Sequence, residues 1–375
     1  MNLEEYAAKE NVLAPAGVPM PRGRLCRSPE EAAAACAELR ACVVKAQVPT
    51  GKRGKAGGIR KADDPGQAAD AARAILGMSI GGHVVEKVLV EERATIAREF
   101  YAAVLSDVAS RSPLVLFSTE GGMDIEEIAA DRPDAIRRRT VELDEGFDAG
   151  AAGVMLAGLD LGGAEARVAQ VLAALYRTYR ERDAELVEVN PLALLDDGRV
   201  AALDCKFTLD DSAAFRQPEL AAVATKERLT GLEQRGAENG LKFIQLDGNV
   251  GVLANGAGLT MTTMDVISHL GGHPANFLEI GGEAYTKGEI ALDLVLSNPG
   301  VKSLVVNFCG AFARTDVMAD GVVRAWEKLK PSLPVFFSVH GTGEEEAVRL
   351  VRERLGIEPY DLMEDAVKAA VEAAR

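Results

Sequence analysis

From residue 250 onward the chain alternates short β-branched segments with helical patterns, and this alternation restricts the possible folds more than any other feature. The strand-like segments read VGVLANG, ANFLEIGG, KSLVVNFCG and VFFSVHG. Strands separated by helices of about 12 residues are typical of βαβ crossovers and a parallel sheet. Because ligands bind beyond the carboxyl ends of parallel strands, we expect loops 254–260, 279–284, 307–314 and 338–343 to form one site.

The first part of the chain has a different order of elements. A helix at 28–40, a strand at 41–48, a second helix at 65–77 and a strand at 83–92 predict a small α+β unit. Ser28 followed by Pro29 indicates where the first of these helices begins.

A second group of elements follows this small unit. Strands are predicted at 100–108 and 112–122 and a long helix at 164–182, and strands 185–195 and 198–207 are expected to form a hairpin. The polar segment 212–240 resembles a connector. We therefore predict one domain over residues 1–235, with a small subdomain at about 21–95, and a second domain over 236–375.

The charge balance limits the possible partners. The 375 residues include 57 acidic and 42 basic side chains, a net charge of −15, which disfavours nucleic acid and anionic membranes as general partners. No run of about 18 apolar residues is present, and the acidic start MNLEEYAAKE does not resemble a secretion signal. The five scattered cysteines indicate reduced, mostly buried thiols, so we expect a cytoplasmic protein.

A basic, glycine-rich loop at residues 50–58 follows the strand that carries Lys45. Glycine allows backbone amides to approach phosphate oxygens, and Lys52, Arg53 and Lys55 can neutralise them. The loop is not a P-loop, because Lys55 is followed by alanine rather than serine or threonine. A solvated basic loop is the alternative interpretation.

The hairpin at 185–207 carries oxygen-bearing side chains. Glu188 and Asn190 point to the same face of a strand, and Asp204 lies near the end of the next strand, so their oxygens can converge. Such a set, completed by phosphates, suits magnesium. Alternatively, Asn190 and Asp204 simply form turns.

Two further acids, Glu91 and Glu99, flank a short segment that contains Arg93 and Arg98. Exposed ion pairs between these arginines and acids are the default interpretation, and contact with a nucleotide is the alternative.

The C-terminal part offers an anion site rather than a nucleophile. The segment Asn255-Gly256-Ala257-Gly258 lies between a strand and a helix and matches a dinucleotide fingerprint only weakly, so an anion at the helix N-terminus is the safer inference. His340 ends a predicted strand at the ligand edge, and no G-x-S-x-G nucleophile motif is present.

Several long motifs in a fixed order make the chain similar to one known family. They read VVKAQV, RGKAGG, VLVE, STEGGMDIEEIA, EVNPLAL, ALDCK, FRQPEL, LDGNVGVLANGAGLTMTTMD and GGHPANFLEIGG. The chain resembles, over its whole length, the β subunit of succinyl-CoA synthetase, the nucleotide-dependent succinate–CoA ligases. The resemblance implies an α/β protein with an N-terminal ATP-grasp domain followed by a flavodoxin-like, parallel-sheet CoA-ligase domain.

The resemblance also implies roles for individual residues. In that family the β subunit binds ATP or GTP with Mg²⁺ and phosphorylates a histidine of a separate α subunit, which also binds CoA. Carried over to this sequence, the nucleotide residues are Lys45, Lys52, Arg53, Gly54, Glu91, Ala94 and Glu99. The implied magnesium ligands are Asn190 and Asp204, and the implied contacts to the carboxylate substrate are Asn255, Ala311, Phe312 and Ala313.

The chain also departs from the family pattern. Lys52 stands where glycine is common, Phe312 lies in a loop that usually reads Gly-Gly-Ile, His340 lies where an arginine-led motif is usual, and Glu283 replaces a glycine. We expect a subunit of an αβ or α2β2 acid–CoA ligase, with succinate as the first candidate substrate and malate or another carboxylate as the second. A stand-alone ATP-grasp carboxylate–amine ligase and a catalytically degenerate regulatory subunit are the rival hypotheses.

Overall fold

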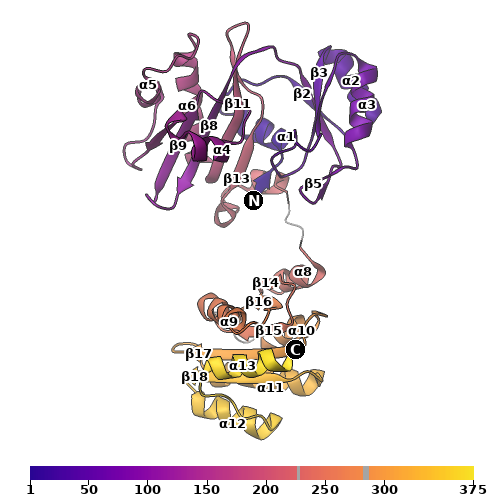
Figure 1. The fold of residues 1–375 in the computed structure, drawn as a ribbon, viewed down its shortest axis with the longest axis vertical. Coiled ribbons are helices and arrows are strands. Elements are labelled where there is room, and N and C mark those ends of the chain that lie inside the picture. The colour runs from indigo at the N-terminus through magenta and orange to yellow at the C-terminus, as the bar shows by residue number, and fades with distance from the viewer. Residues whose placement is uncertain (226–228, 282–286) are drawn as a thin grey trace. The chain divides into compact units, whose positions relative to one another are not determined.

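The computed structural model describes residues 1–225, 229–281 and 287–375 (Figure 1). The chain divides into two compact units, Met1–Glu227 and Arg228–Arg375, each of which is described by itself. The predicted boundary, residue 235, falls within helix α8 (Gly231–Glu238). No helix in the described ranges is long and apolar enough to cross a membrane.

Unit 1 contains a small antiparallel sheet with the strand order β2-β7-β3-β4. Helices α2 and α3 pack together on this sheet (Figure 1). The predicted start of α2 is confirmed: the Ser28 side chain accepts a hydrogen bond from the Glu31 N–H, and Pro29 is the first helical residue. The elements are β2 (Gly23–Cys26), α2 (Pro29–Leu39), β3 (Cys42–Ala46), β4 (Ile59–Ala62), α3 (Pro65–Ile75), β5 (Ser79–Ile80), β6 (His83–Val84) and β7 (Val88–Glu92).

A larger, antiparallel sheet completes unit 1, with the strand order β1-β13-β11-β8-β9-β10 and β12 paired to β11. Helix α6 packs on β8 and β11 and buries its apolar side in the main core. The predicted hairpin is confirmed, since Leu192 of β11 pairs with Ala202 of β12 and Glu188 pairs with Lys206 of β13.

The elements of this larger part are β1 (Asn2–Leu3), α1 (Glu5–Ala8), a π-helical turn (Lys9–Leu13), β8 (Ile96–Asp107), β9 (Ser112–Ser118), α4 (Ile125–Asp131), β10 (Ile136–Thr140), α5 (Ala149–Leu156), α6 (Glu165–Glu181), β11 (Ala184–Leu195), β12 (Val200–Ala202), β13 (Lys206–Leu209) and α7 (Pro218–Val223).

Unit 2 is a three-layer α/β structure around the parallel sheet β15-β17-β18. Helices α9 and α13 pack on one face of the sheet and α10, α11 and α12 on the other. Side chains alternate accordingly along β17: Leu304 and Val306 enter one core and Val305 the other. This arrangement agrees with the predicted parallel-sheet domain.

The elements of unit 2, after α8, are β14 (Phe243–Gln245), β15 (Val250–Ala254), α9 (Ala257–His269), β16 (Asn276–Leu278), α10 (Gly288–Leu296), β17 (Ser303–Gly310), α11 (Thr315–Leu329), β18 (Val335–Gly341), α12 (Glu344–Leu355) and α13 (Met363–Ala373).

One strand differs from the prediction. Strand β16 pairs with β14 in antiparallel fashion and joins β15 only through single parallel bridges at its two ends. The buried Asn276 explains this geometry, because its side chain accepts a hydrogen bond from the Val252 N–H and donates one to the Val252 carbonyl. A side-chain amide thus replaces the backbone ladder between the two strands.

Candidate nucleotide-binding and acid-binding sites

A cavity of about 500 Å³ in unit 1 collects the side chains predicted for the nucleotide and the metal. Its walls come from β3, the β3–β4 loop, β7, the start of β8, β11 and the connection between β12 and β13. The predicted residues in its lining are Lys45, Lys52, Arg53, Gly54, Glu91, Ala94, Glu99, Asn190 and Asp204. Residues that are far apart in the sequence therefore line one cavity.

The basic loop between β3 and β4 is partly buried rather than wholly solvated. Arg53 is 6% exposed, whereas Lys52 and Lys55 are exposed and lie near the Asp124 carboxylate. Lys52 has a φ of 61°, in the left-handed region that favours glycine. At Gly58 a Cβ atom would lie 2.6 Å from Ile80 Cδ1, so the loop can close only around glycine.

Six charged side chains form a connected group of ion pairs beside the cavity, five of them buried and Asp204 partly exposed, and we call this group the charge cluster. It contains three cations and three carboxylates, namely Lys9, Lys45, Arg53, Glu5, Glu91 and Asp204.

Two cations of the charge cluster, Lys45 and Arg53, line the cavity, and each donates hydrogen bonds to several acceptors. The Lys45 ammonium donates to Glu91 Oε2 at 2.5 Å, to the Leu203 carbonyl at 2.6 Å and to Glu5 Oε1 at 3.0 Å. The Arg53 guanidinium donates to Glu5 Oε2 at 2.7 Å and to Asp204 Oδ1 at 2.6 Å.

These neighbours favour the ionised forms of Glu5, Lys45 and Arg53. Burial alone would raise the pKa of Glu5, but the charges of Lys45, Lys9 and Arg53 outweigh burial and hold the pKa well below its ordinary value. Burial likewise opposes the charge on Lys45 and Arg53, and the surrounding carboxylates nevertheless raise both pKa values. Lys45 and Arg53 are therefore permanent cations on the cavity wall.

The default interpretation of Glu91 and Glu99 as members of exposed ion pairs with nearby arginines is wrong. Arg93 pairs with Asp63 at 2.6 Å and Arg98 with Asp160 at 3.3 Å. Glu91 is 3% exposed and pairs with Lys9 and Lys45. Side chains alternate along β7, so Glu91 faces the buried cations Lys9 and Lys45 while the next residue, Glu92, pairs with Arg22 at the surface.

The three oxygen-bearing side chains of the predicted magnesium set all reach the same cavity. Asn190 Oδ1 accepts a hydrogen bond from the Gly122 N–H at 2.7 Å, and Asp204 Oδ1 accepts from Arg53. Glu188 accepts a hydrogen bond from the Tyr101 hydroxyl at 3.0 Å, and burial raises the pKa of Glu188.

This donor set fits Mg²⁺, which prefers carboxylate and amide oxygens and retains positions for phosphates and water. Within the described ranges, no group of three or more His, Cys, Asp or Glu side chains is arranged to hold a metal by itself.

In unit 2 the loops at the carboxyl edge of the sheet are joined by hydrogen bonds. The Asn255 amide donates to the Cys309 carbonyl at 2.9 Å, and its Oδ1 accepts from the Cys309 N–H at 2.7 Å. The Thr342 hydroxyl donates to the Ala311 carbonyl at 2.8 Å. Asn255 therefore contacts the end of β17 and Thr342 contacts Ala311, so three of the four predicted loops are linked at this edge, while residues 282–284, including Glu283, lie outside the described residues.

The two unusual side chains at this edge behave differently. Phe312 is fully exposed, and Ala313 is partly buried against the core of unit 2. His340 is fixed locally: its Nε2 lies 2.7 Å from the Asp361 carbonyl and its Nδ1 lies 3.5 Å from Glu344. Phe312 is therefore available to a ligand or partner, and His340 already has local partners.

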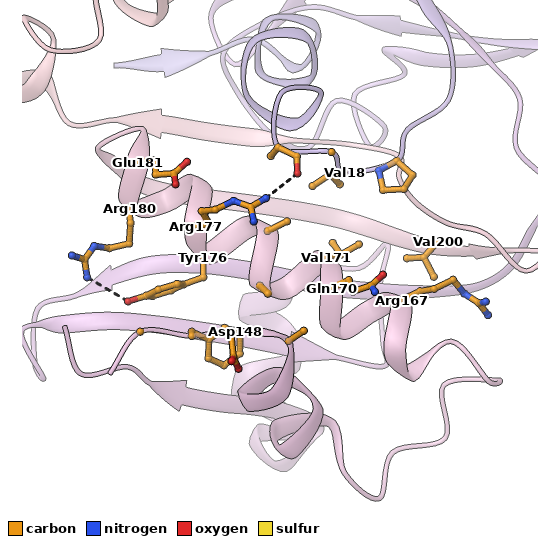
Figure 2. A pocket seen from close by; sticks show the side chains of 18 of the residues that line it. Val18, Asp148, Arg167, Gln170, Val171, Tyr176, Arg177, Arg180, Glu181 and Val200 are labelled. Atoms are coloured by element: carbon orange, nitrogen blue, oxygen red, sulfur yellow. Dashed lines mark hydrogen bonds between the residues drawn. The ribbon is translucent and has the colours of Figure 1, made fainter. Parts of the chain in front are cut away.

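A larger hollow of about 1030 Å³ lies along α6 and shares no lining residue with the 500 Å³ cavity (Figure 2). Arg177 donates to the Ala16 carbonyl, and Arg180 donates to the Tyr176 hydroxyl. None of the residues predicted for the nucleotide or the metal lines this hollow. Size alone therefore does not identify the candidate site.

Glu5 and Lys9 are members of the charge cluster that the sequence analysis missed. Their spacing of four residues near the N-terminus is typical of an ordinary helical ion pair. Their contacts to Lys45, Arg53 and Glu91 span between 40 and 82 residues, and no local pattern indicates them.

Comparison with known proteins agrees with this geometry. Residues 2–194 match the model of the ATP-grasp domain family, and residues 253–371 match the CoA-ligase family. ATP citrate lyase from Methanothrix soehngenii, solved with citrate and coenzyme A, has a similar fold, with a TM-score of 0.75 and 24% identity over 99% of both chains. The fold and the site thus define an ATP-grasp protein with a CoA-ligase domain.

Two curated relatives identify the family more closely. The GDP-forming succinate–CoA ligase subunit beta of Thermus thermophilus is 45% identical and covers 99% of this chain and 98% of its own length. The ADP-forming subunit beta of Roseiflexus sp. (strain RS-1) is 43% identical over the full length of both chains. The chain belongs to the succinate–CoA ligase β-subunit family.

Proposed function

We propose that this chain is the nucleotide-binding β subunit of an acid–CoA ligase that joins a carboxylate, with succinate as the first candidate, to CoA at the expense of ATP or GTP. The observation that carries the proposal is the convergence of the nine predicted nucleotide and metal residues on one cavity of unit 1. An α subunit with an active histidine and a CoA site would complete the enzyme.

The proposed reaction has three steps. In the first step, the γ-phosphoryl group of ATP or GTP is transferred to the α-subunit histidine, and the nucleoside diphosphate is released. In the second step, the phosphoryl group moves from the histidine to a carboxylate oxygen of the acid, which gives an acyl phosphate. The CoA thiol attacks the acyl carbon, forms the thioester and releases phosphate. Such chemistry depends mainly on positioning and on neutralisation of charge.

The residues of this chain would supply that positioning. Lys45 and Arg53 are held as cations at the cavity wall and would meet phosphate oxygens, with the backbone at Gly54 close by. Glu91, Ala94 and Glu99 would surround the base and ribose. Asn190 and Asp204 would hold Mg²⁺, which when bound would supply positive charge that neutralises the phosphates.

The acid would bind at the carboxyl edge of the unit 2 sheet. Asn255 and the backbone of residues 311–313 provide polar groups there, and the exposed Phe312 provides an apolar surface. Malate or another carboxylate is the alternative to succinate as the substrate.

Replacement of Asp204 tests this proposal. We expect the full-length chain to bind ATP or GTP in the presence of Mg²⁺ and to phosphorylate a co-expressed α subunit. Asp204→Ala should abolish the phosphorylation, because it removes a carboxylate from the predicted magnesium set. Transfer of ³²P from labelled ATP and GTP measures the outcome, and thioester formation with a panel of mono- and dicarboxylates names the acid.

Asp70→Ala is a matched control. Asp70 is an exposed acid of unit 1 that pairs with Arg73 and lies outside the cavity lining. Unchanged phosphorylation by the Asp204→Ala variant would contradict the magnesium assignment, and the absence of nucleotide binding by the wild-type chain would contradict the proposed function.

A further inference from the structure

The Glu5 carboxylate lies behind the two cations that line the nucleotide cavity. Its side chain is fully buried, and Glu5 is outside the lining of the 500 Å³ cavity; it borders only a small adjoining hollow of about 150 Å³, which also contacts Arg53 and Asp204. Oε1 accepts from Lys45 at 3.0 Å and is 2.8 Å from Lys9 Nζ, while Oε2 accepts from Arg53 at 2.7 Å. One carboxylate therefore connects both proposed phosphate-binding cations.

The three carboxylates of the charge cluster differ in their freedom to change partners. The side chain of Asp204 is 34% exposed, whereas those of Glu5 and Glu91 are 0% and 4% exposed. A buried charge that loses its partners is expensive, so Glu5 is expected to keep its cations. Asp204 borders the cavity and can exchange Arg53 for another partner at lower cost.

We propose that Glu5 is a positioning residue of the nucleotide site, an inference that rests on the proposed function. Arg53 exchanges Asp204 for a phosphate oxygen when the nucleotide binds, and Glu5 holds the guanidinium in place during this exchange. Through its other oxygen, Glu5 keeps the Lys45 ammonium at the cavity wall. Glu5 itself does not touch the nucleotide.

Two other roles for Glu5 predict different results. If Glu5 only reduced the positive charge near the cavity, its neutralisation would make ATP bind more tightly. If Glu5 only stabilised the fold, its neutralisation would lower the melting temperature and leave the affinity of the folded chain unchanged. Positioning alone predicts a weaker affinity in a chain that is still folded.

The test is equilibrium binding of ATP, with and without Mg²⁺, to the full-length wild-type, Glu5→Gln, Glu5→Asp and Glu4→Gln chains. Circular dichroism first defines a temperature at which each variant is folded. Glu4→Gln is the matched control, because it removes a negative charge one residue away. Glu4 pairs with Lys87 at 2.6 Å, and neither residue belongs to the charge cluster.

We expect Glu5→Gln to weaken ATP binding by roughly tenfold to a hundredfold, which corresponds to the loss of a hydrogen bond to a charged group. Glu4→Gln should remain within about twofold of the wild type, because the partly buried Glu4–Lys87 pair lies outside both the charge cluster and the lining of the cavity. Glu5→Asp keeps the charge but shortens its reach, so its affinity should lie between those of Glu5→Gln and the wild type.

An unchanged or tighter affinity of Glu5→Gln, with normal binding by the wild type, would overturn this inference alone. Failure of the wild-type chain to bind ATP or GTP would instead overturn the proposed function. If Glu5→Gln does not fold, Glu5→Asp decides: an affinity equal to that of the wild type overturns the positioning role.

Discussion

At the residue scale, the nucleotide site depends on residues whose backbone conformation or burial is not indicated by their neighbours in the sequence. Lys52 has a φ of 61°, in the left-handed region that favours glycine. Glu5 and Glu91 are charged residues that are buried with cations rather than solvated. Glu5 remains ionised because Lys45, Lys9 and Arg53 hold its pKa well below the ordinary value.

The lowered pKa of Glu5 predicts a pH dependence of stability. The folded chain binds a proton at Glu5 less readily than the unfolded chain, whose carboxyl has an ordinary pKa near 4.5. The contribution of Glu5 is therefore fully present above about pH 4.5 and is lost as the pH falls toward the lowered pKa. Glu5→Gln should reduce the free energy of unfolding by about 3–5 kcal/mol near pH 7.

Urea unfolding at a series of pH values measures this effect. The difference between the wild type and Glu5→Gln should shrink below about pH 4.5, while Glu4→Gln should show no comparable change. A difference that stays constant down to acidic pH would contradict the ionised state of Glu5.

The exposure of Phe312 predicts a change in substrate preference without a change in stability. Its side chain is fully exposed, so Phe312→Ala should alter the free energy of unfolding by no more than about 0.5 kcal/mol. With an α subunit present, the KM for carboxylates should change while the KM for the nucleotide does not. Phe215→Ala, at another exposed phenylalanine in unit 1, is the control, and equal effects of both variants would contradict a role for Phe312.

At the element scale, helix boundaries and strand ends position the candidate sites. The Ser28–Pro29 start of α2 was predictable because capping depends on a few adjacent residues. Strands β4, β10 and β14 were missed, because they are short and gain their hydrogen bonds from distant partners. For the same reason, the Asn276 bonds that displace β16 from the parallel ladder have no local signal.

The ends of two helices in unit 2 predict opposite effects of substitution. Lys330 closes α11 with φ 47° and ψ 52°, and Gly356 closes α12 with φ 67° and ψ 21°. The left-handed conformation costs an L-residue about 1–2 kcal/mol, part of which is offset by the greater freedom of unfolded glycine. Lys330→Gly should stabilise the chain by about 0.5–1 kcal/mol, and Gly356→Ala should destabilise it by about 1 kcal/mol.

Urea unfolding of the full-length chain checks both substitutions under the same conditions. The sign of each change is the decisive result: destabilisation by Lys330→Gly would contradict the observed helix end.

At the scale of the whole molecule, the chain consists of two units with separate cores. The nucleotide cavity lies in the first unit, and the acid-binding edge of the sheet lies in the second. We therefore expect a ligand that binds one unit to raise the free energy of unfolding of that unit and not of the other, because binding stabilises only the structure that contains the site.

Differential scanning calorimetry tests this expectation. Two unfolding transitions are expected, and Mg²⁺ with ATP at about 100 times its Kd should stabilise one of them by about 2.7 kcal/mol. Asp204→Ala should remove the shift and so assign the transition to unit 1. A single transition that shifts as a whole would show that the two units unfold together and would contradict this expectation.

The long helices α2, α3 and α6, the parallel strands β15, β17 and β18 and the motifs that indicate the family could be read from the sequence, whereas the short strands β4, β10 and β14 could not. Hydrophobic periodicity, helix caps and turn residues are local properties, so the chain displays them before it folds. The same is true of Lys45, Asn190 and Asp204, which local motifs single out as candidates.

Only the tertiary structure decided which of these groups meet and which are buried. Arg53 and Asp204 are separated by 151 positions, and Lys45 and Glu5 by 40, yet all four belong to one charge cluster. The energy of a charge depends on its solvent exposure and on neighbours within a few ångströms, and the chain path alone brings these neighbours together. For this reason the ion pairs that the sequence indicated for Glu91 and Glu99 were wrong, and Glu5 emerged as the centre of the cluster.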